Sequence, residues 1–222
     1  MKLLALETAT DACSAALLVD GELRERFELA PQRHTKLLLP MVGALCAEAG
    51  ITPAALDALA VGVGPGAFTG VRIAAAVAQG LAIAHELPIA PVSTLAALAQ
   101  GAFRRTGRRC VLATLDARRG EIYVGRYGVA PDGRCVAALA PDALCAPAAL
   151  EPGLPAADWI ATGTGWQAYR DALEARFGAR AEAGEVQHPR ALDVATLGLA
   201  LIEAGGGVAP ELLQPVYLRG AI

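Results

Sequence analysis

The sequence contains no asparagine, and only Lys2 and Lys36 are lysines among its 19 basic residues. Charged residues make up 18% of the 222 positions and the net charge is −3. This balance argues against a protein that holds nucleic acid by its own electrostatics, because such proteins are usually basic. Hydrophobic residues make up 55% of the chain, which excludes an intrinsically disordered protein.

Histidine and cysteine are also scarce. His34, His85 and His188 lie far apart, and neither HxxxH nor HExxH occurs. The five cysteines are an odd number without a CxxC pair. Metal centres and disulfide frameworks normally show such spacings, so we expect no metal site and mostly buried, free thiols.

Long hydrophobic runs are missing as well. The longest apolar stretch, residues 71–84, is interrupted by Arg72 and Gln79, whereas a membrane-spanning helix needs about 20 apolar residues. The first seven residues are too short for a signal-peptide core. We therefore predict a cytoplasmic protein that does not associate with a membrane.

The hydrophobic pattern of the first half predicts a mixed sheet with helices. Alternating or continuous apolar runs indicate strands, and apolar residues three or four positions apart indicate helices. Pro40 should bend or break the helix that contains it. The predicted elements are strands 2–8, 13–19 and 22–29, helix 34–48, strand 57–63, helix 69–84, strand 89–92 and helix 93–103.

The composition becomes basic and polar at residues 104–109, which predicts two domains, 1–104 and 105–222. The element order resembles the actin-like ATPase (ribonuclease H-like) fold. The predicted class is α/β, with two lobes of mixed sheets flanked by helices and an abbreviated second lobe. The second-lobe elements are strands 110–115, 121–128 and 134–139, an irregular segment 141–157 with one short helix, strand 158–162, helices 166–177 and 192–204, and an extended end.

Two stretches of the first lobe suggest anion binding. Thr8, Thr10 and Asp11 form a polar turn between the first two strands, where backbone N–H groups and hydroxyls could cradle a phosphate. An ordinary hairpin turn explains the same residues. The glycine-rich segment 64–70 precedes a helix, but it is not a P-loop because no Gly-Lys-Ser/Thr follows.

The two helices 34–48 and 69–84 carry more apolar surface than one sheet face can cover. Small residues recur every fourth position in the second helix, which lets another helix approach closely. This pattern predicts a partner interface, although purely internal packing is the alternative. The predicted interface residues are Leu37, Leu38, Met41, Leu45, Val71, Ala74, Ala75, Ala78 and Ala82.

A further turn carries two arginines, Arg118 and Arg119, flanked by Asp116 and Glu121. These arginines could form ion pairs within the turn, or they could bind phosphate or RNA.

Several motifs together resemble the TsaB (YeaZ) family over essentially the whole chain. The most specific are Gly64-Pro65-Gly66-Ala67-Phe68-Thr69-Gly70-Val71-Arg72-Ile73 and Asp116-Ala117-Arg118-Arg119-Gly120-Glu121-Ile122-Tyr123; Leu6-Glu7-Thr8-Ala9-Thr10, Pro91-Val92-Ser93-Thr94-Leu95 and Pro215-Val216-Tyr217-Leu218-Arg219 agree with them. Family members more often have Asp where Glu7 stands.

The resemblance implies a non-catalytic partner, a dimerisation scaffold, of TsaD in tRNA threonylcarbamoyladenosine (t6A) synthesis. TsaD, with TsaE and TsaC, modifies the adenosine beside the anticodon of ANN-decoding tRNAs. The resemblance also implies a heterodimer with TsaD, a homodimer when the chain is alone, and tRNA contact only through the complex. No catalytic residue, metal or resident cofactor is expected, and any ATP or ADP binding should be weak outside the complex.

Two other functions compete with this one. The first is an independent small-molecule kinase or ATPase of the actin-like superfamily. The second is a metalloprotease, because the label peptidase family M22, or glycoprotease, attaches to these proteins by similarity. The missing HxxxH motif argues against the protease, and the lack of an obvious catalytic aspartate between the lobes argues against the kinase.

Overall fold

The computed structural model describes residues 1–151, 159–177 and 186–219. By contacts the chain groups into two units. Unit 1 consists of Met1–Ala97 and Pro189–Val216, and unit 2 consists of Leu98–His188 and Tyr217–Ile222. The predicted domain boundary after residue 104 remains a prediction.

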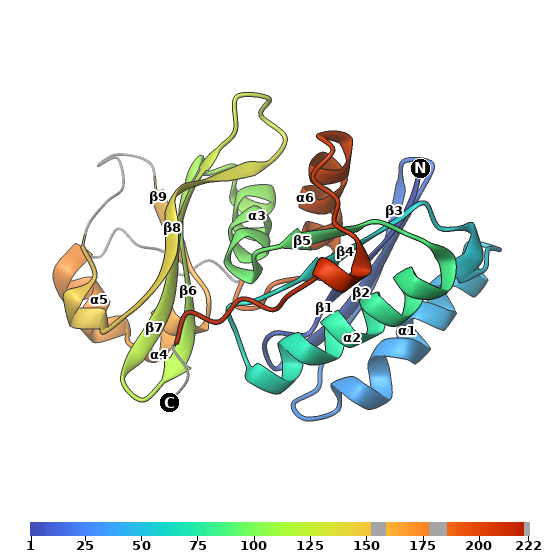
Figure 1. Ribbon diagram of the computed structural model, residues 1–222. Helices are drawn as coiled ribbons and strands as arrows, with labels where there is room; N and C mark the ends of the chain where they lie inside the picture. Colours follow the sequence, from blue (N-terminus) through green and yellow to red (C-terminus); the bar gives the residue numbers. More distant parts are fainter. Residues whose placement is uncertain (152–158, 178–185, 220–222) are drawn as a thin grey trace. The chain divides into compact units, whose positions relative to one another are not determined.

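Unit 1 is built on a five-stranded mixed sheet with the order β3-β2-β1-β4-β5 (Figure 1). The first three strands pair antiparallel, whereas β4 and β5 continue the sheet in parallel from β1. Residues 3–6 of β1 and all of β4 are buried and apolar on both faces, as expected for strands covered on both sides. The strands are β1 (Lys2–Glu7), β2 (Ala12–Val19), β3 (Glu22–Leu29), β4 (Ala58–Gly62) and β5 (Ile89–Val92).

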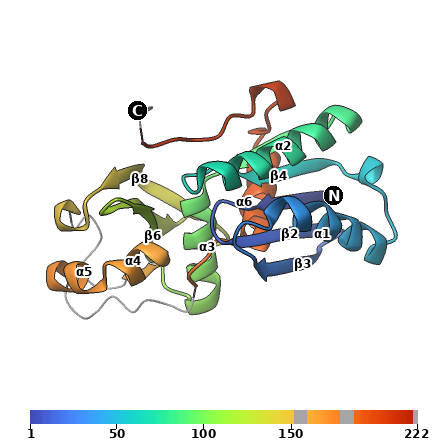
Figure 2. The ribbon, with the colours of Figure 1, turned by 90° about the horizontal axis from the view of Figure 1, so that it is seen from below.

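Helices cover both faces of this sheet. Helices α1 (His34–Glu48) and α2 (Phe68–His85) pack on the face that contains Leu4 and Leu6. Helix α6 (Ala191–Glu203) packs on the opposite face, which contains Leu3 and Ala5, and Figures 1 and 2 show the two layers. The alternation of side chains along β1 therefore supplies two separate cores from one strand.

Three local features of unit 1 refine the sequence predictions. Helix α1 runs without a break through Pro40. Residues Pro53–Ala55 and Pro210–Leu212 form single turns of 3-10 helix, η1 and η3. Gly198 of α6 lies so close to the sheet that a Cβ there would stand 2.3 Å from the Cβ of Ala60. The glycine is needed for the close packing of α6.

Unit 2 contains a four-stranded mixed sheet with the order β8-β7-β6-β9. Trp166 is fully buried in its core, beside Trp159 and Phe177. The helices are α3 (Thr94–Thr106), which begins in unit 1, then α4 (Thr164–Ala168) and α5 (Arg170–Phe177), with η2 at Pro147–Ala149. The strands are β6 (Cys110–Arg118), β7 (Glu121–Val129), β8 (Val136–Cys145) and β9 (Trp159–Thr162).

Two predictions for unit 2 are wrong. Strand β8 continues to Cys145, so the segment predicted as irregular is extended over its first residues. Pro141 is tolerated there because β8 is at the edge of the sheet. The helix predicted for residues 166–177 is two helices, which separate at Tyr169. Residues 146–151 of the predicted irregular segment contain one short helical turn, η2, as predicted, and residues 152–157 lie outside the described residues.

Candidate functional site

The turn between β1 and β2 is organised around the carboxylate of Glu7. This side chain is 1% exposed. The backbone N–H of Ala9 donates a hydrogen bond of 2.6 Å to Oε1, and the hydroxyl of Thr94 donates one of 3.3 Å to Oε2. Thr94 in turn accepts a hydrogen bond from the N–H of Gly64. One carboxylate thus links the turn to the first residue of α3 and, through it, to the glycine-rich segment.

Burial changes the acidity of Glu7. Removal from water raises its pKa to about 7, although hydrogen bonds from Ala9, Thr94 and Thr8 act in the opposite direction. Gly62 leaves the space that the carboxylate occupies, because a Cβ at this position would stand 2.0 Å from Oε2. The last residue of β4 is therefore matched to the last residue of β1.

The glycine-rich segment packs directly against the turn. The hydroxyl of Thr8 donates to the carbonyl of Gly70 at 2.7 Å, and the N–H of Ala67 donates to the carbonyl of Ala9 at 2.7 Å. A Cβ at Gly66 or Gly70 would stand 2.4 Å from the Ala9 oxygen and 2.1 Å from the Thr8 oxygen, respectively. These glycines allow the backbone of the segment to approach the backbone of the turn.

The three predicted phosphate-binding residues lie together in this turn but face different surroundings. Thr8 is fully buried, and its hydroxyl is already engaged with Gly70. The Thr10 hydroxyl accepts a hydrogen bond from Ala12, and Nε2 of His34 lies 2.9 Å from the Thr10 carbonyl oxygen. Asp11 is exposed. Phosphate binding by this turn remains a prediction.

Sequence reasoning missed the role of Glu7. The sequence singled out Glu7 only within a family motif, whereas the structure makes its carboxylate the acceptor for the N–H of Ala9. A tight turn offers few such donors to an anion. At least one donor that a phosphate would need is therefore already bound to a carboxylate of the same chain.

The predicted partner residues on α1 and α2 are mostly not on the surface. Leu37 and Met41 are partly buried. The expectation that the other seven form an exposed surface is wrong, because they belong to the core between the helices and the sheet. The seven buried residues are Leu38, Leu45, Val71, Ala74, Ala75, Ala78 and Ala82.

The solvent side of the same two helices includes several small or apolar residues beside the charged Lys36 and Arg72. We call it the outer face and define it by five exposed residues, Leu39, Pro40 and Gly43 of α1 with Ala76 and Gly80 of α2. Leu39 is 54% exposed. Among the described residues, a Cβ placed on Gly43 or Gly80 would meet no atom within 4 Å. The described part of the chain therefore does not require a glycine at either position.

The charged turn of unit 2 forms one ion pair within itself and a second with Arg219 near the end of the chain. Arg118 lies 3.0 Å from Asp116, and Arg219 pairs with Glu121 at 2.5 Å. Arg118 and Arg119 both adopt the left-handed backbone conformation. The interpretation of this turn as an internally paired hairpin is supported for Arg118, and Arg119 is exposed.

Metal-binding clusters and membrane-spanning helices are two further features that the described residues can be asked for. Within residues 1–151, 159–177 and 186–219, no group of three or more His, Cys, Asp or Glu side chains is placed to hold a metal ion. In the same part of the chain, α2 has the length and apolar composition of a membrane span. Its inward face packs on the five-stranded sheet, as the core helix of a globular unit does.

Comparison with known proteins shows the family of the chain. Residues 28–214 match the family model described as TsaD, tRNA N6-adenosine threonylcarbamoyltransferase. The tRNA threonylcarbamoyladenosine biosynthesis protein TsaB of Escherichia coli is 42% identical over 100% of this chain and 96% of its own length. The chain belongs to the TsaB family. The Haemophilus influenzae TsaB is 37% identical over 100% of this chain and 95% of its own length.

Solved structures agree with this assignment to the TsaB family. The structure described as YeaZ from Pseudomonas aeruginosa is 43% identical, has a TM-score of 0.90, and is matched over 98% of this chain and 99% of that one. The chain is thus a TsaB-family protein of tRNA threonylcarbamoyladenosine biosynthesis, and it lies within the wider TsaD family. Its α/β architecture of two mixed sheets flanked by helices is that of YeaZ.

Proposed function

We propose that this chain is a non-catalytic partner of a TsaD protein, which it binds through the outer face of α1 and α2. In this proposal TsaD transfers the threonylcarbamoyl group to the adenosine beside the anticodon of ANN-decoding tRNAs, and the chain acts as its dimerisation scaffold. TsaE joins the complex, tRNA contacts the chain only through the complex, and two copies pair through the same face when TsaD is missing. The cytoplasm is the proposed location.

The two exposed glycines carry this proposal. A glycine inside a helix costs about 1 kcal/mol relative to alanine. Gly43 and Gly80 are both exposed, and neither has a neighbour that excludes a side chain. A partner backbone that lies directly on the helices would explain them, because glycine permits close approach. The apolar side chain of Leu39 beside them supports the same surface.

The site at the β1–β2 turn supports a non-catalytic role. The alternative, an independent small-molecule kinase or ATPase of the proposed actin-like fold, needs this turn to hold a phosphate. The N–H of Ala9 already binds the carboxylate of Glu7, and the Thr8 hydroxyl already binds Gly70. In the segment after Pro91, which the resemblance matches to the HxxxH metal site of TsaD, Ser93 caps α3 and Thr94 binds Glu7.

The test is co-expression with the TsaD of the same organism, followed by co-purification and light scattering. Variants Gly43→Arg and Gly80→Arg place a charge on the outer face, and the Cβ of either new side chain would meet no described atom within 4 Å. We expect each variant to lose TsaD binding and homodimerisation, because an unpaired charge buried in an interface lowers the binding affinity strongly. Ala74 and Ala78 are unsuitable for this test, since both are fully buried.

The matched control is Ala172→Arg, an exposed position on α5 in unit 2. It adds the same charge to a helix outside the outer face, and it should bind TsaD as the unmodified chain does. Circular dichroism checks that all three variants are folded. Full TsaD binding and full dimerisation by both glycine variants would refute the assignment of the outer face.

A further inference from the structure

The N-termini of three helices meet at the β1–β2 turn of unit 1. Nε2 of His34, the first residue of α1, lies 2.9 Å from a carbonyl oxygen of the turn. The start of α2 is joined to the turn through the N–H of Ala67 and the carbonyl of Gly70. Thr94, the first residue of α3, binds the carboxyl group of Glu7. A change in this turn therefore alters the surroundings of all three helix starts.

The carboxyl group of Glu7 connects the turn to the other segments. Its Oε1 accepts the N–H of Ala9, and its Oε2 is bound to the hydroxyl of Thr94, which also accepts the N–H of Gly64. Oε2 occupies the space beside Gly62 at the end of β4, where a Cβ would stand 2.0 Å away. The connection depends on a carboxyl group that has almost no access to water.

The groups that surround this carboxyl group are neutral. Ala9 and Thr94 bind it, and Ser14 is its neighbour across the β1–β2 ladder. The titratable side chains nearest in sequence to these contacts are Asp11, Arg33, His34, Lys36, Arg72, Arg190 and Asp193. Among the described residues, no charged group contributes to the shifted pKa of Glu7, which arises from burial and hydrogen bonds. An ionised carboxylate at this position would lack the opposite charge that a buried ion usually needs.

We propose that the carboxyl group of Glu7 is a proton-operated latch between the β1–β2 turn and the glycine-rich segment 64–70. With the proton bound, the neutral group stays buried and joins the turn to Gly64 through Thr94. When the proton leaves to solvent, the turn separates from residues 64–70 and water reaches the carboxylate. The rest of unit 1 stays folded.

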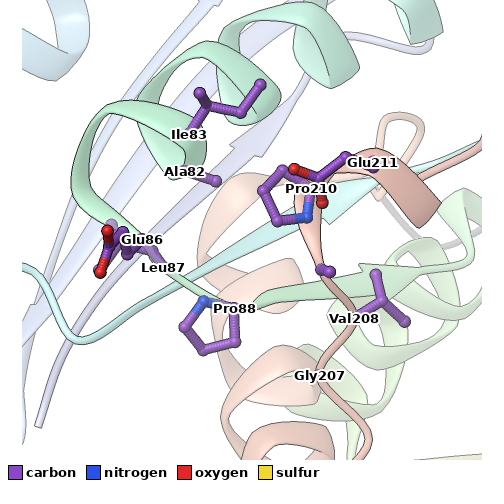
Figure 3. Close-up of a pocket in the computed structure, with 10 residues that line it drawn as sticks. Ala82, Ile83, Glu86, Leu87, Pro88, Gly207, Val208, Pro210 and Glu211 are labelled. Atoms are coloured by element: carbon purple, nitrogen blue, oxygen red, sulfur yellow. The ribbon is translucent and has the colours of Figure 1, made fainter.

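The opening is local because the remainder of α2 has other anchors. The side-chain amide of Gln79 donates hydrogen bonds to the carbonyls of Pro210 and Leu213, at 3.0 and 3.3 Å. Figure 3 shows the last turns of α2 beside the segment that leads into η3. The inward face of α2 also packs on the five-stranded sheet. None of these contacts involves the β1–β2 turn.

The latch operates near neutral pH. Burial raises the pKa of Glu7 to about 7 in the closed form, whereas a carboxyl group in contact with water has the ordinary value of 4.5. The closed form therefore loses stability relative to the open form as the pH rises. From these two values, the ratio of open to closed form should increase about tenfold between pH 6 and pH 8.

Opening of the latch also loosens the first turn of α2, which carries part of the outer face. We expect TsaD to bind more weakly at pH 8 than at pH 6 for this reason. This consequence rests on the proposed function, whereas the latch itself does not. The experiment below uses the chain without TsaD, so failure of the latch and failure of the proposed function are distinguishable.

The experiment measures amide hydrogen exchange of the isolated full chain, labelled with 15N, at pH 6 and pH 8. Exchange rates are corrected for the intrinsic effect of pH on exchange. We expect the N–H groups of Ala9, Gly64 and Ala67 to lose protection about tenfold. They should also exchange about tenfold faster or more than the N–H of Leu59 in the central strand β4, which opens only when unit 1 unfolds. Low concentrations of urea should accelerate exchange at Leu59 but not at the other three.

Glu7→Gln keeps an acceptor for Ala9 but has no proton to lose, so its protection should be the same at both pH values. The matched control, Asp11→Asn, removes an exposed carboxylate of the same turn and should keep the tenfold change. The carboxyl 13C resonance of Glu7, titrated in the unmodified chain, keeps the test decisive if the glutamine variant does not fold, because the loss of protection must follow this titration.

Three results would each overturn the proposal. The first is protection and urea dependence at Ala9, Gly64 and Ala67 equal to those at Leu59, because the turn would then open only by unfolding of unit 1. The second is a loss of protection that persists in Glu7→Gln. The third is a loss of protection that does not follow the ionisation of Glu7.

Discussion

Replacing Glu7 by glutamine should remove a pH dependence of stability from unit 1. In the folded protein the pKa of Glu7 is about 7, whereas the ordinary value is 4.5. Between these two values the unfolded chain releases the proton and the folded chain keeps it. Unfolding is therefore favoured as the pH rises through this window, and the effect levels off above about pH 7.

The size of the effect follows from the two pKa values. Each unit of pKa difference corresponds to about 1.4 kcal/mol. Between pH 5 and pH 8, the free energy of unfolding of the unmodified protein should fall by about 2.5 kcal/mol relative to Glu7→Gln. The glutamine variant has no proton to release, and its side-chain oxygen can still accept the hydrogen bond from Ala9.

The assay needs a probe that reports unit 1. All tryptophans and tyrosines lie in unit 2, so fluorescence follows unit 2 alone. Far-UV circular dichroism follows the backbone of both units, and the part of the urea transition that fluorescence does not show belongs to unit 1. The carboxyl 13C resonance of Glu7 gives its pKa directly. Asp11→Asn is the control, because Asp11 is exposed in the same turn. An equal stability difference between wild type and Glu7→Gln at pH 5 and pH 8 would refute the reasoning.

Four further substitutions test the packing. Gly80→Ala should raise the free energy of unfolding by about 1 kcal/mol in a urea titration, and an unchanged value would remove the argument that glycine is costly there. Gly70→Ala should lower it by about 2 kcal/mol or more, since the added Cβ would stand 2.1 Å from the Thr8 oxygen; wild-type stability would contradict this contact. Glu86→Gly should stabilise α2 by about 0.5–1 kcal/mol in the same assay, and destabilisation would show that Glu86 has a structural partner. Trp166→Ala should destabilise unit 2 by about 3–5 kcal/mol, measured by the fluorescence of the remaining tryptophan.

The sequence pattern predicted most of the fold because local signals were strong. The strands of unit 1 and helices α1, α2 and α6 carry clear periodicity, and Ser93 caps α3 as expected. The extension of β8 was missed because Pro141 usually ends a strand, and only the edge position of β8 makes it acceptable. The break at Tyr169 was missed because the apolar spacing of residues 166–177 continues across it.

The site was harder to predict because its contacts are distant in sequence. Glu7 meets Thr94, 87 positions away, and no local pattern indicates such a contact. The interface prediction selected the most apolar residues of α1 and α2. Most of these residues are buried in the core between the helices and the sheet. The feature that indicates the proposed interface is instead a pair of helical glycines with open space around them, Gly43 and Gly80. Sequence alone cannot distinguish a glycine beside empty space from one that is pressed against a sheet, such as Gly198.

The discontinuity of unit 1 has a consequence for protein synthesis. Residues 189–216 complete this unit, but the ribosome makes them last. Until α6 emerges, the sheet face that contains Leu3, Ala5 and Ala60 lacks the helix that supplies most of its packing partners in the folded protein. Unit 1 is therefore the first unit whose synthesis begins, but it cannot finish folding until residues 189–216 are made. While unit 2 is being synthesised, part of an apolar sheet face of unit 1 is exposed on the nascent chain. Premature termination before α6 would leave a product with a permanently exposed core, a substrate for chaperones and proteases.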